Sequence, residues 1–238
     1  MYEFQTRVRY SELDEYGKMS IGSMVDLMQD TSTFQSEDLQ VGGRYLSEKG
    51  LAWMVSFWQI VIDRVPDYLE EVIAGTSAHG FTPAFGLRNF VILDQERNHL
   101  VRANSYWVLI DRQTGRPIRI PQEEITPYPC AEPIEMDYCP RKITVTEELT
   151  AAEPLTVQRH HLDTNLHVNN GQYIKIALEC IPADAEIREL RVEYRNQALL
   201  GDCIVPWVGE RDDRYVVRLT DEQGQPYAVM AFYKREKK

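Results

Sequence analysis

The chain lacks any apolar run long enough to cross a membrane. Its most hydrophobic stretch, residues 51–62, is interrupted by Ser56 and Gln59 and falls short of the ~20 residues that a membrane helix needs. The segment 1–20 carries charges throughout and lacks the apolar core of a signal peptide. We therefore expect neither a membrane span nor a secretory leader.

Cysteine and basic residues are also scarce. The chain has four cysteines without CxxC spacing or a zinc-like pattern with histidine, namely Cys130, Cys139, Cys180 and Cys203. We expect them to be reduced, mostly buried thiols in a cytoplasmic protein. Lysine and arginine number 26 against 37 acidic residues, giving a net charge of −11. This balance excludes a general nucleic-acid binder, because such proteins need a basic surface.

What the chain does contain is typical of a folded protein. Hydrophobic residues make up 43% and charged residues 26% of the 238 positions. This length allows one large domain or two domains of about 120 residues, and either arrangement can bury a core.

Two stretches of the sequence resemble each other and suggest an internal repeat. Residues 9–22 align with residues 158–171 without a gap. The identical positions are Leu13/Leu162, Asp14/Asp163 and Gly22/Gly171. Three identities in one window can arise by chance, so the order of predicted elements has to support the repeat.

The predicted elements do follow the same order in both halves. In the first half a strand at about 3–10 leads into a helix from about residue 22, followed by strands near 51–62, 70–80, 84–94 and 99–111. In the second half a strand near 154–161 leads into a helix over 170–180, followed by strands near 186–198, 202–210, 213–220 and 226–235.

The connection between the halves is rich in proline and indicates an extended linker. We therefore predict an N-terminal repeat over 1–125, a linker over 126–140 and a C-terminal repeat over 141–238. One helix against five strands in each half predicts an α+β protein. The simplest arrangement curls each antiparallel sheet around its helix, which makes a double hot-dog fold.

Chemistry-bearing side chains gather just before the second helix. His160, His161 and His167 lie within eight residues, together with Asp163 and Asn165. Such a loop can move protons and orient a polar substrate. On a strand, His160 and His161 point to opposite faces, so they do not easily share a metal ion.

The start of this helix also predicts hydrogen-bond donors for an anionic intermediate. Asn169 or Asn170 suits the N-cap position. The unpaired backbone N–H groups of Asn170 and Gly171 are then candidates for an oxyanion hole.

The stretch Leu162-Asp163-Thr164-Asn165-Leu166-His167-Val168-Asn169-Asn170 resembles the D-x-N-x-H-V-N-N signature of the acyl-acyl carrier protein thioesterase family. Two further segments, 190–195 and 50–53, also resemble that family, so the similarity extends over both halves. The resemblance implies a double hot-dog fold, release of fatty acid from acyl carrier protein thioesters, and no cofactor. It also implies Asp163, Asn165 and His167 as catalytic residues.

One part of the family pattern is altered. Where plant members read Y-R-R-E-C, this chain reads Tyr194-Arg195-Asn196-Gln197-Ala198. A cysteine nucleophile is therefore impossible at Ala198. Gln197 cannot act as a base, but its amide can hold a water or orient His167.

Thioester hydrolysis at this loop requires no metal. Asp163 either activates a water or attacks the carbonyl itself, and His167 shuttles protons. Asn165 binds the carbonyl or positions the nucleophile. In the first repeat the position of His167 is occupied by Lys18, so we predict one active site per chain, with Asp14 as a turn residue.

Several alternatives stay open at this stage. An acyl-CoA thioesterase, or a non-catalytic hot-dog regulator that binds acyl chains, would use the same scaffold. Trp53, Met54 and Phe57 are candidates for the acyl pocket, although aromatic residues on strands are more often plain core. The chain can be a monomer or a homodimer. An acidic carrier protein requires a local basic patch, for which the candidates are Arg112, Arg116, Arg119, Arg141, Lys142, Lys234, Arg235, Lys237 and Lys238.

Overall fold

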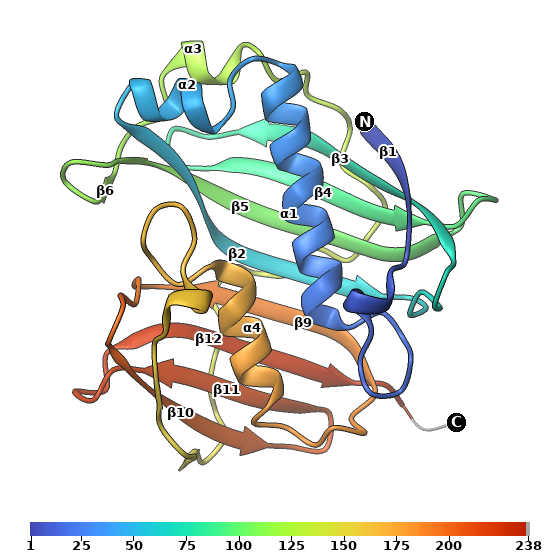
Figure 1. Ribbon diagram of the computed structural model, residues 1–238, viewed down its shortest axis with the longest axis vertical. Coiled ribbons are helices and arrows are strands. Elements are labelled where there is room, and N and C mark those ends of the chain that lie inside the picture. Colours follow the sequence, from blue (N-terminus) through green and yellow to red (C-terminus); the bar gives the residue numbers. More distant parts are fainter. Residues whose placement is uncertain (237–238) are drawn as a thin grey trace. The chain divides into compact units, whose positions relative to one another are not determined.

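The structure, a computed structural model, describes residues 1–236 and divides into two compact units. The first unit comprises Met1–Ser56 and Ile60–Tyr138, and the second comprises Phe57–Gln59 and the chain from Cys139 onward. Each unit places one main helix against an antiparallel sheet (Figure 1). The predicted α+β class and the hot-dog arrangement in each half are confirmed.

The first unit is built on five long or medium strands in the order β1-β3-β4-β5-β2. The main helix α1 packs against β3 and β1, and β6 pairs with the end of β5. The elements are β1 (Tyr2–Arg7), α1 (Ile21–Asp38), α2 (Gly43–Glu48), β2 (Leu51–Ile62), β3 (Glu71–Phe81), β4 (Gly86–Leu93), β5 (His99–Asp111), β6 (Arg116–Pro117) and α3 (Gln122–Ile125).

The second unit repeats this arrangement with a shorter helix. Its strands follow the order β9-β12-β11-β10-β7, and β8 pairs with the start of β10. The elements are β7 (Thr150–Ala151), β8 (Leu155–Thr156), α4 (Asn170–Leu178), β9 (Ile187–Tyr194), β10 (Cys203–Glu210), β11 (Arg214–Thr220) and β12 (Pro226–Lys234).

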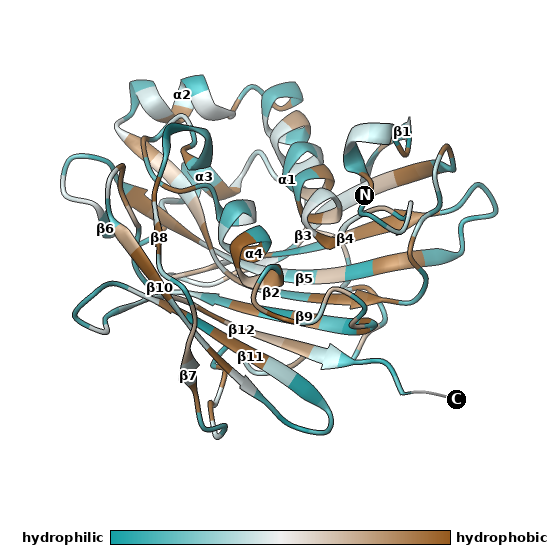
Figure 2. Ribbon diagram, turned by 60° about the horizontal axis from the view of Figure 1, so that its bottom comes forward, coloured by the Kyte–Doolittle hydropathy of each residue, from teal (hydrophilic) through white to brown (hydrophobic). Residues whose placement is uncertain are grey.

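Both main helices form where a polar cap precedes a periodic apolar face. The Ser20 hydroxyl accepts a hydrogen bond from the Ser23 N–H at the start of α1, and the Asn169 side chain caps α4 in the same way. The buried residues of α4 recur at helical spacing, as Tyr173, Ile174 and Ala177 show. Hydrophobic residues follow the strands and hydrophilic residues gather in the loops (Figure 2).

One predicted strand is mostly a turn in the structure. The strand expected near 154–161 is reduced to β8, and the chain then forms a 3₁₀ turn over Arg159–His161. The turn forms because the His161 N–H donates to the Gln158 carbonyl (3.0 Å). The rings of His160 and His161 consequently meet edge to face, with centroids 4.1 Å apart and an interplanar angle of 60°, and do not point to opposite faces of a strand.

The proline-rich connector packs against the first unit along much of its length. Tyr128 is buried in a cluster with Val41 and Ala78, and the Tyr138 hydroxyl donates to the Asn89 side-chain oxygen (3.1 Å). After this connector the chain passes from the first compact unit to the second between Tyr138 and Cys139. In the described part of the chain, no helix has the length and apolar character required to cross a membrane.

Candidate active site

The predicted catalytic residues lie on one tight turn before α4. The Asp163 carboxylate organises this turn, because its Oδ1 accepts hydrogen bonds from the N–H groups of Asn165 (2.7 Å) and His167 (3.4 Å). Its Oδ2 accepts from the Asn165 side-chain amide (3.4 Å), and the Asp163 N–H donates to the His167 carbonyl (2.8 Å). The structure therefore brings Asp163, Asn165 and His167 together.

The first unit contains the same turn, which confirms the internal repeat at the level of hydrogen bonds. Asp14 Oδ1 accepts from the N–H groups of Tyr16 (3.0 Å) and Lys18 (2.9 Å). The Asp14 N–H donates to the Lys18 carbonyl at 2.8 Å, the distance seen in the second turn. Asp14 is thus a turn residue, as predicted. Isolated bridges close both turns, Leu13 with Met19 and Leu162 with Val168.

The two turns differ in the side chains that they carry. Lys18 pairs with Asp67 across a β-bridge, whereas His167 stands at the corresponding bridge opposite Leu199. Gly17 takes the left-handed conformation in the first turn (φ 76°), and Leu166 takes it in the second (φ 63°) with 71% of its surface exposed. A leucine is strained at this φ. The second turn therefore combines a strained backbone with a basic imidazole, as functional sites often do.

The His167 side chain has one buried face. Its Nδ1 atom is shielded from solvent and has no hydrogen-bond partner among residues 1–236. The Nε2 atom is then the one left to exchange a proton with a substrate or a water.

The start of α4 has one remaining backbone donor. Asn169 is the N-cap, and its Oδ1 accepts from the Gly171 N–H (2.8 Å). The Gln172 N–H donates to the Asn169 carbonyl (2.9 Å). No residue in the described chain accepts a hydrogen bond from the Asn170 N–H, which is therefore the donor suited to a developing oxyanion.

A second segment, Gln197–Leu199, supports the catalytic turn. The Ala198 carbonyl accepts from the Val168 N–H (3.0 Å), and Leu199 forms a β-bridge with His167. Ala198 is fully buried, whereas Gln197 is exposed. The positions where the family pattern has glutamate and cysteine thus adjoin the turn that carries His167.

Tyr173 holds this segment in place, a role that was not predicted from the sequence. Its hydroxyl accepts a hydrogen bond from the Ala198 N–H (2.8 Å), and its ring is 2% exposed. Burial raises the pKa of the Tyr173 hydroxyl, which stays protonated at neutral pH. The available signal was a polar aromatic residue on the apolar face of the α4 helix.

Replacing Tyr173 by phenylalanine is expected to lower the free energy of unfolding by about 1–3 kcal/mol, because the buried Ala198 N–H then loses its acceptor. Urea unfolding followed by circular dichroism measures this change. The exposed Tyr16, in the turn of the first unit, provides the matched control Tyr16→Phe, which should leave stability unchanged. Equal stability of Tyr173→Phe and the wild type would refute the positioning role.

His161 stabilises the backbone next to the candidate active site. Its Nδ1 accepts a hydrogen bond from the Gln158 N–H (3.0 Å), and its carbonyl accepts from the Asn169 N–H (2.9 Å). Burial, and then the neighbouring His160, lower the pKa of the His161 imidazole. His161 thus supports the N-cap residue of α4 through its backbone carbonyl.

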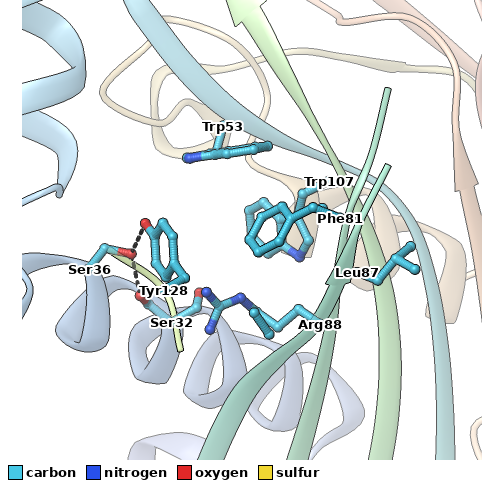
Figure 3. A pocket seen from close by; sticks show the side chains of 10 residues that line it. Ser32, Ser36, Trp53, Phe81, Leu87, Arg88, Trp107 and Tyr128 are labelled. Atoms are coloured by element: carbon cyan, nitrogen blue, oxygen red, sulfur yellow. Dashed lines mark hydrogen bonds between the residues drawn. The ribbon is translucent and has the colours of Figure 1, made fainter. Parts of the chain in front are cut away.

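The first unit has a half-open cavity between α1 and the strands β2 to β5. Trp53, Phe81, Trp107 and Tyr128 form its aromatic walls, and Arg88 forms its floor (Figure 3). Of the three acyl-pocket candidates from the sequence, Trp53 lines this cavity. Met54 is half-buried and Phe57 is fully buried, and neither is among the lining residues.

Comparison with protein families matches nearly the whole chain. Residues 1–128 match the acyl-ACP thioesterase N-terminal domain, and residues 144–229 match the acyl-ACP thioesterase C-terminal domain. The two matches leave out residues 129–143, which include most of the proline-rich connector.

Curated relatives are chloroplast enzymes of plants. The palmitoyl-acyl carrier protein thioesterase of Cuphea hookeriana is 31% identical over 161 residues, which are 63% of this chain and 39% of the relative. An acyl-[acyl-carrier-protein] hydrolase of Cuphea viscosissima is 28% identical over 206 residues, covering 80% of this chain and 50% of the relative. The chain thus spans half or less of the length of these relatives.

Solved structures share the fold over the full chain. An acyl-ACP thioesterase from Bacteroides thetaiotaomicron superposes with a TM-score of 0.87 at 22% identity, covering 98% of this chain and 97% of that one. The 12:0-ACP thioesterase from Umbellularia californica gives a TM-score of 0.84 at 20% identity, covering 100% and 98%.

Proposed function

Because the chain belongs to the acyl-ACP thioesterase family, we propose that it hydrolyses fatty acyl-acyl carrier protein thioesters to free fatty acid and holo carrier protein. The observation that carries this proposal is the comparison of the two turns. Their backbone hydrogen bonds are alike, but only the second presents an imidazole and a carboxamide, at His167 and Asn165.

In the proposed mechanism a water attacks the thioester carbonyl while His167 Nε2 accepts its proton. The tetrahedral oxyanion receives hydrogen bonds from the Asn170 N–H and from the Asn165 side-chain amide. When the intermediate collapses, the C–S bond breaks and His167 returns the proton to the departing sulfur of the pantetheine arm. The products are a carboxylic acid and a thiol, so no oxidant, metal or cofactor enters the balance.

Two roles are proposed for Asp163, and they make different demands on its carboxylate. As an electrostatic partner it stabilises the imidazolium that forms on His167 during water attack. As a nucleophile it attacks the thioester carbonyl and forms an anhydride that water then opens. The hydrogen bonds to its Oδ1 favour the first role, because that oxygen already accepts from two backbone N–H groups.

Gln197 is proposed to assist the reaction through hydrogen bonding alone. It lies two residues before Leu199, which forms an isolated β-bridge with His167, and its amide carries both a donor and an acceptor. In this proposal the Gln197 amide holds the attacking water by hydrogen bonds, a role that does not require a titratable group.

The aromatic cavity of the first unit is proposed to hold the acyl chain. Its walls provide the apolar surface that a fatty acyl chain buries, and Trp53 and Phe81 lie beside Gly86 at one end. A β-carbon added at Gly86 would approach the Phe81 ring to 3.2 Å, so glycine keeps this end of the cavity open.

Recognition of an acidic carrier protein requires a positively charged patch on this protein, although its own net charge is negative. Arg112, Arg116 and Arg119 are exposed on the hairpin that contains β6, and none forms an ion pair within residues 1–236. Lys234 is instead paired with Glu210, and Lys237 and Lys238 lie outside the described residues. We therefore propose this hairpin as the docking patch for the acidic carrier protein.

Matched acyl carrier protein and acyl-CoA thioesters of one chain length test this proposal. We expect kcat/KM to be about tenfold or more higher for the carrier protein, since electrostatic steering raises association rates by ~10–10³-fold. Charge reversal of all three hairpin arginines to glutamate should remove this advantage and leave the CoA reaction largely unchanged. A higher kcat/KM for the CoA thioester would identify an acyl-CoA thioesterase, and release from neither donor would leave a non-catalytic acyl-binding protein.

We also propose a cytoplasmic location. The four cysteines are free thiols, which persist in reducing compartments. The expectation that most of them are buried was wrong, because Cys130 is exposed and the other three are half-buried.

A further inference from the structure

The sheet of the second unit is covered on both faces by different parts of the chain. Helix α4 packs against β11 and β12 and lies in front of this sheet in Figure 1. Residues 143–149, which we call the strap, lie on the other face, where Ile143 packs in a cluster with Val216 of β11. Because side chains alternate between the faces of a strand, Arg218 shares the strap face with Val216.

The strap covers this face only in part. It approaches β10 so closely at Gly209 that a β-carbon added there would lie 2.7 Å from the Glu147 β-carbon, so glycine is required. The strap then continues into β7, which pairs with β10 at Trp207 and Val208. A cleft of about 400 Å³ remains between the strap and the strands, within the usual size of small-molecule sites.

The floor of this cleft carries an arginine without a counterion. Arg218 is half-buried, and its side chain forms neither an ion pair nor a hydrogen bond with any of residues 1–236. Its neighbours on the adjacent strands are Trp207 and Val229, which are both uncharged. A guanidinium stays charged at neutral pH and brings five N–H donors, so Arg218 offers an unused site for an anion.

Other half-buried arginines on the same face of the sheet are paired. Arg191 lies 2.7 Å from a carboxylate oxygen of Glu189, and Arg214 lies 2.7 Å from one of Glu147. Glu147 also lines the cleft, but its carboxylate is fully buried and already accepts a hydrogen bond from Arg214. The missing partner of Arg218 is therefore not a general property of arginines on this face.

The walls beside Arg218 are apolar and held in place. The Trp207 Nε1 donates to the Thr220 hydroxyl (3.2 Å), which in turn donates to the Asp221 carbonyl (2.9 Å). These hydrogen bonds fix the orientation of the indole ring. Val145 and Leu149 of the strap complete the apolar lining. A ligand thus meets a preorganised flat surface next to a positive charge.

This combination is suited to an anion with an apolar tail. A carboxylate has two oxygens that match the guanidinium, and its single negative charge neutralises Arg218. A phosphate monoester carries about −1.5 to −2 charges at neutral pH, which is more than one arginine offsets in a chain with a net charge of −11. The cleft therefore favours an alkyl carboxylate.

We propose that this cleft is a second ligand site of the protein and binds a free fatty acid, with the carboxylate on Arg218 and the alkyl chain against Trp207 and Leu149. The source of this ligand rests on the proposed function, since hydrolysis of the thioester releases a fatty acid. None of the residues that line the cleft belongs to the catalytic turn or to segment 197–199. Fatty acid bound here consequently leaves the catalytic residues free.

Fluorine NMR tests this site without enzymatic turnover. Protein labelled with 5-fluorotryptophan carries one probe at each of its four tryptophans, and Trp207→Phe identifies the Trp207 signal. We expect decanoate to shift the Trp207 signal to saturation, and the Kd obtained from this signal describes the cleft alone. The same Kd is expected for His167→Ala, because the catalytic turn does not contribute to the cleft.

Variants of Arg218 test the recognition of the carboxylate. Arg218→Met should raise the Kd for decanoate by about tenfold or more, since hydrogen bonds to charged groups are the stronger class. Arg218→Lys should raise it less, because lysine keeps the charge but not the planar fork. The matched control is Lys142→Met, which removes an exposed positive charge of the same unit and should leave the Kd unchanged.

Two further ligands test the chemical class in the wild type. Decanol has the same chain without the charge, and we expect its Kd to be about tenfold or more higher than that of decanoate. Decyl phosphate should also bind more weakly than decanoate. Equal binding of decanol and decanoate would overturn the role of Arg218, and tighter binding of decyl phosphate would overturn the choice of a carboxylate.

The remaining outcomes separate the cleft from the proposed function. A Trp207 signal that decanoate does not shift, or an unchanged Kd in a folded Arg218→Met, would overturn the site even if the protein hydrolyses thioesters. A saturable, Arg218-dependent shift in a protein that releases no fatty acid from any thioester would support the site and refute only the enzyme. Should Arg218→Met fail to fold, as judged by circular dichroism, the comparison of decanoate with decanol decides.

Discussion

Replacing His167 by alanine is expected to reduce kcat for acyl carrier protein hydrolysis by about 10²- to 10⁴-fold, the usual contribution of a positioned proton-transfer group. KM should change little, because the imidazole acts on the attacking water and the leaving sulfur and does not hold the carrier protein. Steady-state release of free fatty acid from a purified acyl carrier protein thioester measures both constants.

The variant should remain folded, because the His167 Nδ1 forms no hydrogen bond within residues 1–236 and the backbone groups of the turn are untouched. The first unit offers the matched control Lys18→Ala, at the equivalent turn position, where we expect no more than a minor change in rate. Equal rates for the wild type and His167→Ala would show that the site assignment is wrong.

Replacing Asp163 by asparagine is expected to reduce kcat by about 10²-fold or more while preserving the turn. The asparagine side-chain oxygen can accept the same hydrogen bonds from the N–H groups of Asn165 and His167, so the geometry is retained and the negative charge is lost. The variant therefore separates the chemical role of the carboxylate from its structural role. Thermal unfolding should show nearly the same midpoint as for the wild type.

The control is Asp14→Asn in the first unit, where the same two kinds of hydrogen bond exist and no catalytic role is assigned. It should leave both rate and stability nearly unchanged. If Asp163→Asn lowers kcat by less than about threefold, Asp163 has only the turn-forming role that Asp14 has. Uptake of ¹⁸O by Asp163 during single turnover in labelled water would identify the nucleophilic role with the anhydride opened at the aspartyl carbonyl, because water activation leaves the aspartate oxygens unexchanged.

The sequence predicted the fold well where local periodicity and tertiary packing agree. Strand β2 spans the predicted 51–62, and the other long strands begin and end within a few residues of the prediction. The prediction failed near 154–161, because pairing with β10 ends after β8 and the 3₁₀ turn at His161 then satisfies the backbone locally. Whether a short polar segment finds a strand partner depends on contacts distant in sequence.

The candidate site could be located from the sequence because its residues lie close together along the chain. The turn around Asp163, the N-cap at Asn169 and the comparison with Lys18 all follow from local pattern. Tyr173 and Arg88 were not found, because their roles depend on partners far away in sequence, at Ala198 and Gln35. For Arg88 the only signal was a charged residue two positions before the buried Phe90 on a strand.

The most direct measurement is the amount of free fatty acid and holo carrier protein that the wild-type protein releases from a purified acyl carrier protein thioester. The account predicts complete conversion by catalytic amounts of enzyme, with equal amounts of acid and thiol formed. Absence of fatty acid release above the uncatalysed rate, from folded protein and across chain lengths, would contradict it.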